Sequence, residues 1–159
     1  MRVLGIKEGE EIAYFNNKRI SHDGIQFRSK DEVHFWEYLK RQKEKELIRN
    51  FEYESESFVL IPAFKFLGTT VRAITYCPDF TIYHNDGGVE YIETKGMLTN
   101  EATLKIKMFK YHLNVNLPEA KYQVLSRNLT HGDIDGEWID YYKLKKIRAA
   151  NKKKKKEIE

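Results

Sequence analysis

The chain has 159 residues and a net charge of +4, and 41% of its residues are hydrophobic. This length fits one soluble domain, and so high an apolar content excludes an intrinsically disordered protein. The single cysteine, Cys77, excludes an internal disulfide and a zinc site with two thiolate ligands. The sequence has no apolar run of the length of a membrane span or a secretion signal. We therefore expect a cytoplasmic protein with no membrane partner.

Charge is unevenly distributed along the chain. Residues 143–159 carry eight lysines and one arginine against two glutamates, which leaves residues 1–142 with a net charge of −3. We divide the sequence into an N-terminal extension (1–28), a folded domain (29–142) and a basic C-terminal tail. Five consecutive lysines repel one another, so we expect this tail to be flexible and disordered. These lysines are Lys152, Lys153, Lys154, Lys155 and Lys156.

The first 28 residues alternate short mixed segments with polar turns, which predicts loops and a short hairpin. A helix is predicted next, because Ser29 and Glu32 have the spacing of a capping box. Apolar residues at helical spacing, among them Phe35 and Leu39, extend this helix to about residue 47 or 48.

Three β-branched and aromatic runs follow, at residues 58–66, 69–83 and 89–95, and they predict three strands. The turn at residues 85–88, Asn-Asp-Gly-Gly, favours a hairpin between the second and third strands.

A second helix is predicted from about residue 100 to 113, ending before Pro118, and a fourth strand at residues 121–126. The element order is therefore αβββαβ, which predicts an α/β fold with a mixed central sheet flanked by helices. A further helical segment is predicted at residues 136–150.

The predicted hairpin brings two acids and a lysine together. Strand alternation places Glu93 and Lys95 on one face, and ordinary hairpin register brings Asp79 close to Glu93. Two adjacent carboxylates repel each other unless a cation lies between them, and oxygen ligands favour Mg²⁺ or Mn²⁺ over Zn²⁺. Such a site suits hydrolysis of phosphodiesters. The alternative is that all three are ordinary charges at strand edges.

Residues 76–80 (YCPDF) and 91–96 (YIETKG) resemble the motif of the PD-(D/E)XK nuclease superfamily, and the αβββαβ order is similar to its restriction-endonuclease-like core. The series Phe27-Arg-Ser29 with Glu32, then residues 51–54 (FEYE) and 61–62 (IP), resembles small phage-encoded Holliday junction resolvases of the endonuclease I type. It also resembles a related phage PD-(D/E)XK family of poorly defined function. The similarity covers residues 26–127.

The resemblance implies a magnesium-dependent endodeoxyribonuclease, in which Mn²⁺ substitutes for Mg²⁺. By the resemblance, Glu32, Asp79 and Glu93 hold the metal and Lys95 assists the attacking water. The implied substrate is branched DNA of phage recombination and replication, cut by a homodimer in the host cytoplasm. Past residue 129 there is little correspondence. Capping of the helix alone would also explain Glu32.

Further basic residues are candidates for DNA contacts. Lys105 and Lys107 lie on the second helix, whose expected core face consists of Leu104, Met108 and Tyr111. The tail lysines 152–156 would bind phosphates with an affinity that falls as the salt concentration rises. A solvated face would explain the helix lysines equally well, and a solubilising extension would explain the tail.

Three other functions remain open. A restriction- or transposase-type DNA endonuclease would use the same core with a separate recognition element. A catalytically silent DNA-binding module would keep the fold without cleavage, and a basic-tailed RNA-binding protein would not need Asp79. The five histidines show no metal-ligand spacing, so we expect them to have no role in the site.

Overall fold

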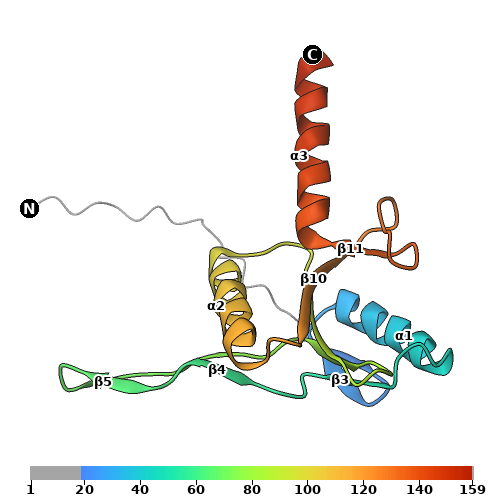
Figure 1. Cartoon of the computed structure of the whole chain (residues 1–159). Helices are drawn as coiled ribbons and strands as arrows, with labels where there is room; N and C mark the ends of the chain where they lie inside the picture. The colour runs from blue at the N-terminus through green and yellow to red at the C-terminus, as the bar shows by residue number, and fades with distance from the viewer. Residues whose placement is uncertain (1–18, 159) are drawn as a thin grey trace, which may run out of the picture.

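The computed structural model describes residues 19–158, and a mixed five-stranded sheet forms their centre (Figure 1). In spatial order its strands are β11 (Trp138–Asp140), β10 (Lys121–Arg127), β9 (Val89–Thr94), β8 (Phe80–Tyr83) and β3 (Asn50–Tyr53). The pairs β3–β8, β8–β9 and β10–β11 are antiparallel, and β9–β10 is parallel. A parallel pair needs a crossover connection, and helix α2 (Asn100–Asn116) supplies it. The predicted α/β class is confirmed.

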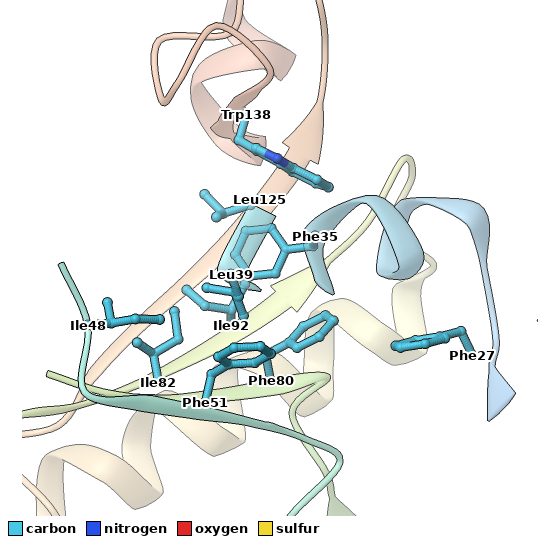
Figure 2. Close-up of a cluster of buried hydrophobic side chains, with 10 residues drawn as sticks. All are labelled: Phe27, Phe35, Leu39, Ile48, Phe51, Phe80, Ile82, Ile92, Leu125 and Trp138. Carbon is cyan, nitrogen blue, oxygen red and sulfur yellow. The ribbon is translucent and has the colours of Figure 1, made fainter. Parts of the chain in front are cut away.

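Helix α1 (Lys30–Glu44) and helix α2 cover opposite faces of this sheet (Figure 1). Successive strand residues point to opposite faces, so Ile92 packs with the α1 cluster while Tyr91 packs with the α2 cluster. Figure 2 shows the α1 cluster, with Phe35 and Leu39 projecting from the helix toward the sheet. The helix begins where predicted, because the Ser29 side chain accepts a hydrogen bond from the backbone N–H of Glu32.

The first strand of the core is not the predicted one. Residues 58–66 were expected in this position, but β3 occupies it and pairs with β8. Phe51 of β3 is buried in the α1 cluster, whereas residues 61–70 are exposed throughout. The αβββαβ order of the core therefore holds, but with a four-residue strand that is too short for a clear alternating pattern.

Residues 58–76 form a two-stranded ribbon, which we call the arm, that extends away from the sheet beyond α2 (Figure 1). Near its base β4 (Phe58–Ile61) pairs with β7 (Ile74–Tyr76), and toward its tip β5 (Phe64–Phe66) pairs with β6 (Thr69–Val71). The base packs onto α2, with the Phe58 ring 5.0 Å from the Phe109 ring. The two long strands predicted at residues 58–66 and 69–83 are thus five short ones, four of them in the arm and the fifth, β8, in the central sheet.

The buried face of α2 also differs from the prediction. Leu104 and Tyr111 were expected in the core, but their side chains are 58% and 71% exposed. The buried residues are Ile106, Phe109 and Leu113. Both stripes have helical spacing, so periodicity alone could not choose between them. Phe109 decides it, because its ring packs among four other aromatic rings, those of Phe58, Tyr76, Tyr91 and Tyr122.

The predicted hairpin before α1 is confirmed, and it belongs to the core. Strands β1 (Ile20–His22) and β2 (Ile25–Phe27) pair around Asp23 and Gly24, which both have positive φ. Phe27 is fully buried in the α1 cluster, so the expected boundary at residue 28 does not separate an extension from the domain. The segments expected before residue 19 lie outside the described residues.

The end of α1 and the C-terminal helix correct three further expectations: where α1 ends, where the last helix begins, and that the lysine tail is disordered. Helix α1 ends at Glu44 instead of residue 47 or 48, because Glu46 adopts a positive φ of 55°. Strand β11 occupies part of the segment predicted as helix, and α3 (Tyr141–Ile158) runs through all five tail lysines. Lysine and alanine are strong helix formers, and in a helix that projects into solvent (Figure 1) lysine side chains can spread apart. None of the helices in the described part of the chain is long and apolar enough to cross a membrane.

We predict that Phe35→Ala lowers the free energy of unfolding by about 3 to 5 kcal/mol, because the ring is buried against Tyr38, Phe80 and Trp138. Urea denaturation followed by circular dichroism measures this loss. Leu47→Ala is the control, since this side chain is 59% exposed and its removal should change stability by less than about 0.5 kcal/mol. Equal effects of both substitutions would contradict the described core.

Candidate active site

Asp79, Glu93 and Lys95 converge at one end of the sheet. Asp79 immediately precedes β8, and the pairing of Phe80 with Ile92 continues so that Asp79 faces Glu93 across the two strands. Lys95 follows β9, and its Nζ lies 2.8 Å from Oε1 of Glu93. The structure thus brings together the two acids and the lysine that the sequence singled out.

Asp79 is buried to 2% exposure and is held by the neighbouring strand. The backbone N–H and the hydroxyl of Thr94 both donate to Oδ2 of Asp79, at 2.8 and 2.9 Å. Burial, together with the negative charge of Glu93, raises the pKa of Asp79 to about 7. Both hydrogen bonds fall on one oxygen, so Oδ1 keeps its lone pairs for another ligand.

Glu93 is fixed by a pair of tyrosines. The hydroxyl of Tyr76 donates to Oε2 of Glu93 at 2.6 Å, and it lies 2.7 Å from the hydroxyl of Tyr122. Burial and the charge of Glu93 raise the pKa of Tyr76, so this phenol stays protonated and acts as a donor. Burial lowers the pKa of Lys95, but Asp79 and Glu93 more than offset it, so the ammonium stays charged.

Glu32 is the third predicted acid, and the structure gives it several partners at the start of α1. The backbone N–H of Arg28 and the hydroxyl of Tyr53 donate to its Oε2 at 2.8 and 2.7 Å, and the hydroxyl of Ser29 donates to its Oε1. Glu32 is 2% exposed. Its negative charge raises the pKa of both Asp79 and Lys95, although burial and the nearer site charges have larger effects on these two pKa values. Glu32 therefore both caps the helix and adds negative charge to the site.

The sequence did not single out Arg28 and Glu54 as site residues. Arg28 Nη2 lies 2.6 Å from Glu54 Oε1, and the backbone N–H of Glu54 donates to the carbonyl oxygen of Asp79. Burial lowers the pKa of Arg28, but Glu54, Tyr53 and the site acids outweigh it and raise the pKa. Tyr53, Tyr76 and Thr94 were also missed. The capping-box spacing next to Arg28 and the resemblance of residues 27–29 and 51–54 pointed to this region, but no pattern assigned a role to the hydroxyl donors.

The donor set suits a hard cation at Asp79 and Glu93. Each carboxylate oxygen can accept more than one bond, and oxygen-only ligands favour Mg²⁺ or Mn²⁺. Glu32 does not complete a single tight coordination shell. Among the described residues, the one group of three possible ligands whose atoms all lie within 4.8 Å of one another is elsewhere, at His22, Asp23 and Glu37. Glu32 would therefore act on a bound ion from outside that shell.

The His22 group brings a histidine close to two acids, but it is an ion-pair cluster. His22 Nε2 is 2.6 Å from Glu37 Oε1, and Lys40 Nζ is 2.8 Å from Asp23 and 3.1 Å from Glu37. The ammonium of Lys40 already pairs with both carboxylates. This arrangement gives no reason to place a metal there.

The lysines predicted to bind DNA lie on helices α2 and α3, not at the end of strands β8 and β9 where Asp79 and Glu93 lie. Lys105 pairs with Glu101 one turn earlier on α2, at 3.2 Å. Lys107 lines a groove of about 470 Å³ between α2 and the base of the arm. The five tail lysines, residues 152–156, are exposed on α3.

We predict that Asp79→Asn raises the free energy of unfolding at pH 8, by roughly 1 to 4 kcal/mol. The folded protein binds the Asp79 proton more tightly than the unfolded chain does, because the pKa rises from 3.8 to about 7. The wild type therefore loses stability as the pH rises from about 4 to 7, and the variant lacks this loss. Urea titrations in EDTA across this pH range measure it.

Asp86→Asn is the control, with the opposite sign. The Gly88 N–H donates to Asp86 and lowers its pKa, so this carboxylate favours the folded state at neutral pH. A lower free energy of unfolding for Asp79→Asn at pH 8 would contradict the prediction, because it would show that the buried, charged Asp79 does not destabilise the folded state.

Comparison with known proteins identifies the family of the chain. Residues 12–139 match the family described as Protein of unknown function (DUF1064). This range contains the five-stranded sheet except for the last residue of β11, as well as the arm and all four candidate site residues, and it ends before α3. Comparisons with curated proteins and with solved structures gave no match. Since the match spans most of its length, the chain belongs to the DUF1064 family.

Proposed function

We propose that the chain is a metal-dependent endodeoxyribonuclease that hydrolyses phosphodiester bonds in branched DNA. The convergence of two buried carboxylates and a charged lysine at the end of β8 and β9 carries this proposal. Branched DNA, phage recombination and a homodimer that makes paired cuts come from the sequence resemblance. A cytoplasmic location belongs to the same proposal and fits the free thiol of Cys77.

The energetics of the site support a functional explanation for these charges. Burying a carboxylate is costly, and a second carboxylate nearby adds repulsion. A sheet that needed only stability would place apolar residues here. Asp79 instead keeps one oxygen free and has a pKa raised to about 7. Groups with strongly shifted pKa values are frequent at sites of chemistry.

The residues of the chain have distinct roles in this proposal. A divalent cation held by Asp79 and Glu93 would supply a bound water of lowered pKa and positive charge against the phosphate. Lys95 stays protonated and one-third exposed, so its ammonium can orient the attacking water and stabilise the negative charge that develops on the phosphate. Tyr76 holds Glu93 in place. Arg28, half exposed beside the acids, can contact the incoming phosphate.

A catalytically silent DNA-binding module is the second candidate. It is favoured by the partners of the acids, since Glu93 is bonded to Tyr76 and Lys95 and Glu32 to Tyr53 and Ser29. Glu32 also lies outside a single tight shell with the other two acids. Metal binding and cleavage together separate the two candidates.

We expect the wild type to cut a labelled four-way junction in Mg²⁺ or Mn²⁺ and not in EDTA. Asp79→Asn and Lys95→Ala should each lower the rate by at least about 100-fold, because each removes a charge at the reacting phosphate. Asp86→Asn, an exposed aspartate in the 85–88 turn, is the matched control and should cut normally. The same cleavage assay is carried out on linear duplex DNA, single-stranded DNA and RNA.

Calorimetry with Mn²⁺ gives a second readout that does not depend on activity. Binding that is lost in Asp79→Asn and kept in Asp86→Asn supports the metal site. Cleavage of every DNA form would reject branched DNA while keeping the nuclease, and DNA binding without metal binding or cleavage would favour the silent module.

We also expect the lysines of α3 to contribute nonspecific DNA affinity. Replacing residues 152–156 with glutamine should lower affinity for duplex DNA and reduce the slope of log K against log salt by about 1 to 4. Replacement of the same residues with arginine keeps the charge and should keep the slope. An unchanged slope in the glutamine variant would assign α3 a role other than phosphate binding.

A further inference from the structure

The arm has a charge that sets it apart from the rest of the domain. No acidic residue occurs between Glu56 and Asp79, whereas Lys65 and Arg72 both lie on the arm. Residues 1–142 as a whole have a net charge of −3. The arm is therefore a positive projection on an acidic body, and it suits a polyanion.

The pairing register gives the outer part of the arm two different faces. Phe64 pairs with Val71 and Phe66 with Thr69, so these side chains share one mainly apolar face. Lys65 pairs with Thr70 and therefore points to the opposite face. All of these residues are exposed. The ribbon thus presents an apolar face and a basic face to its surroundings.

The tip of the arm is the most exposed apolar part of this ribbon. Phe66 is 62% exposed and Leu67 is 90% exposed, at a turn that Leu67 and Gly68 form with positive φ. A two-stranded ribbon has little stability alone in water, and exposed apolar groups of this size indicate a binding surface.

The base of the arm is joined directly to the candidate active site. Tyr76, the last residue of β7, donates to Glu93, and the chain reaches Asp79 three residues later. On the other side of the arm, Glu54 donates its backbone N–H to Asp79. A ligand that lies along the arm is therefore held beside the two acids.

We propose that the arm binds DNA, with Lys65 and Arg72 on the phosphates and the Phe66–Leu67 tip inserted between neighbouring bases. This inference rests on the proposed function and names the feature of the substrate that the site selects. Apolar side chains that enter a base step partly unstack it, at a cost in free energy. Bases at a junction or bulge are already less well stacked, so this cost is smaller there. The arm would thus favour branched or bulged DNA.

Charge argues against a second copy of the chain as the occupant. The exposed apolar face of α2 is the surface beside the arm base that a partner's arm would enter, and it carries Lys107. Pairing of the arm with that face would bring positive charges together. DNA meets both basic surfaces with opposite charge.

The test compares three full-length variants in EDTA, where binding is measured without cleavage. The tip variant is Phe66→Ser with Leu67→Ser, and the charge variant is Lys65→Gln with Arg72→Gln. Leu129→Ser is the control, since Leu129 is 67% exposed and lies outside the arm. The probes are a linear duplex, a bulged duplex and a four-way junction, each with 2-aminopurine at one position. Circular dichroism confirms that each variant is folded.

We expect wild type and Leu129→Ser to bind the bulged duplex and the junction more tightly than the linear duplex, and to increase 2-aminopurine fluorescence. The tip variant should lose the fluorescence change and at least about tenfold in affinity. The charge variant should lower the slope of log K against log salt by about 2.

Unchanged DNA binding and fluorescence in the tip variant would overturn the proposal. So would tighter binding of an RNA duplex of the same sequence, or a wild-type dimer that light scattering shows to become monomeric in the tip variant. Failure of the nuclease proposal is distinguishable, because it would appear as DNA bound and unstacked by the arm in EDTA but never cut in Mg²⁺ or Mn²⁺.

Discussion

The antiparallel pairing of β8 with β9 is the constraint on which the candidate site depends. Phe80 pairs with Ile92, and this register places Asp79 opposite Glu93. A slip of one residue would turn Glu93 toward α1 and away from the hydroxyl of Tyr76. The register is held by burial, because Ile92 packs with the α1 cluster and Tyr91 with the α2 cluster. The packing that stabilises the sheet therefore also forces two carboxylates together.

Two tyrosines connect the acids to the two halves of the core. Tyr53 donates to Glu32, and its ring packs against the rings of Phe27 and Phe80 on the α1 side. Tyr76 donates to Glu93, and its ring packs against Phe109 on the α2 side. Each acid is thus positioned by a side chain whose orientation is fixed by aromatic packing. Rigid support of this kind is what a site with closely spaced charges needs.

The sequence predicted features with a strong local pattern and missed those decided by packing. The capping box at Ser29 and the 85–88 turn require particular side chains, so they were recognisable. The buried face of α2 was not recognisable, because two apolar stripes have the same spacing and only the packing of Phe109 against neighbouring aromatic rings chooses between them. Arg28 was missed for a similar reason, since its place beside Asp79 depends on how α1 meets β8.

Under the proposed function, the geometry would also account for the attraction of a polyanion to an acidic site on an acidic body. The arm and α3 are both basic, and they project from the body in different directions (Figure 1). Yet each is anchored near the site, the arm through Tyr76 on Glu93 and α3 through the hydroxyl of Tyr141, which accepts from the backbone N–H of Leu98 just after Lys95. In that proposal, a polyanion bound at the bases of both projections would lie close to Asp79. Long-range attraction would then come from the projections, while the buried acids would remain available for a cation.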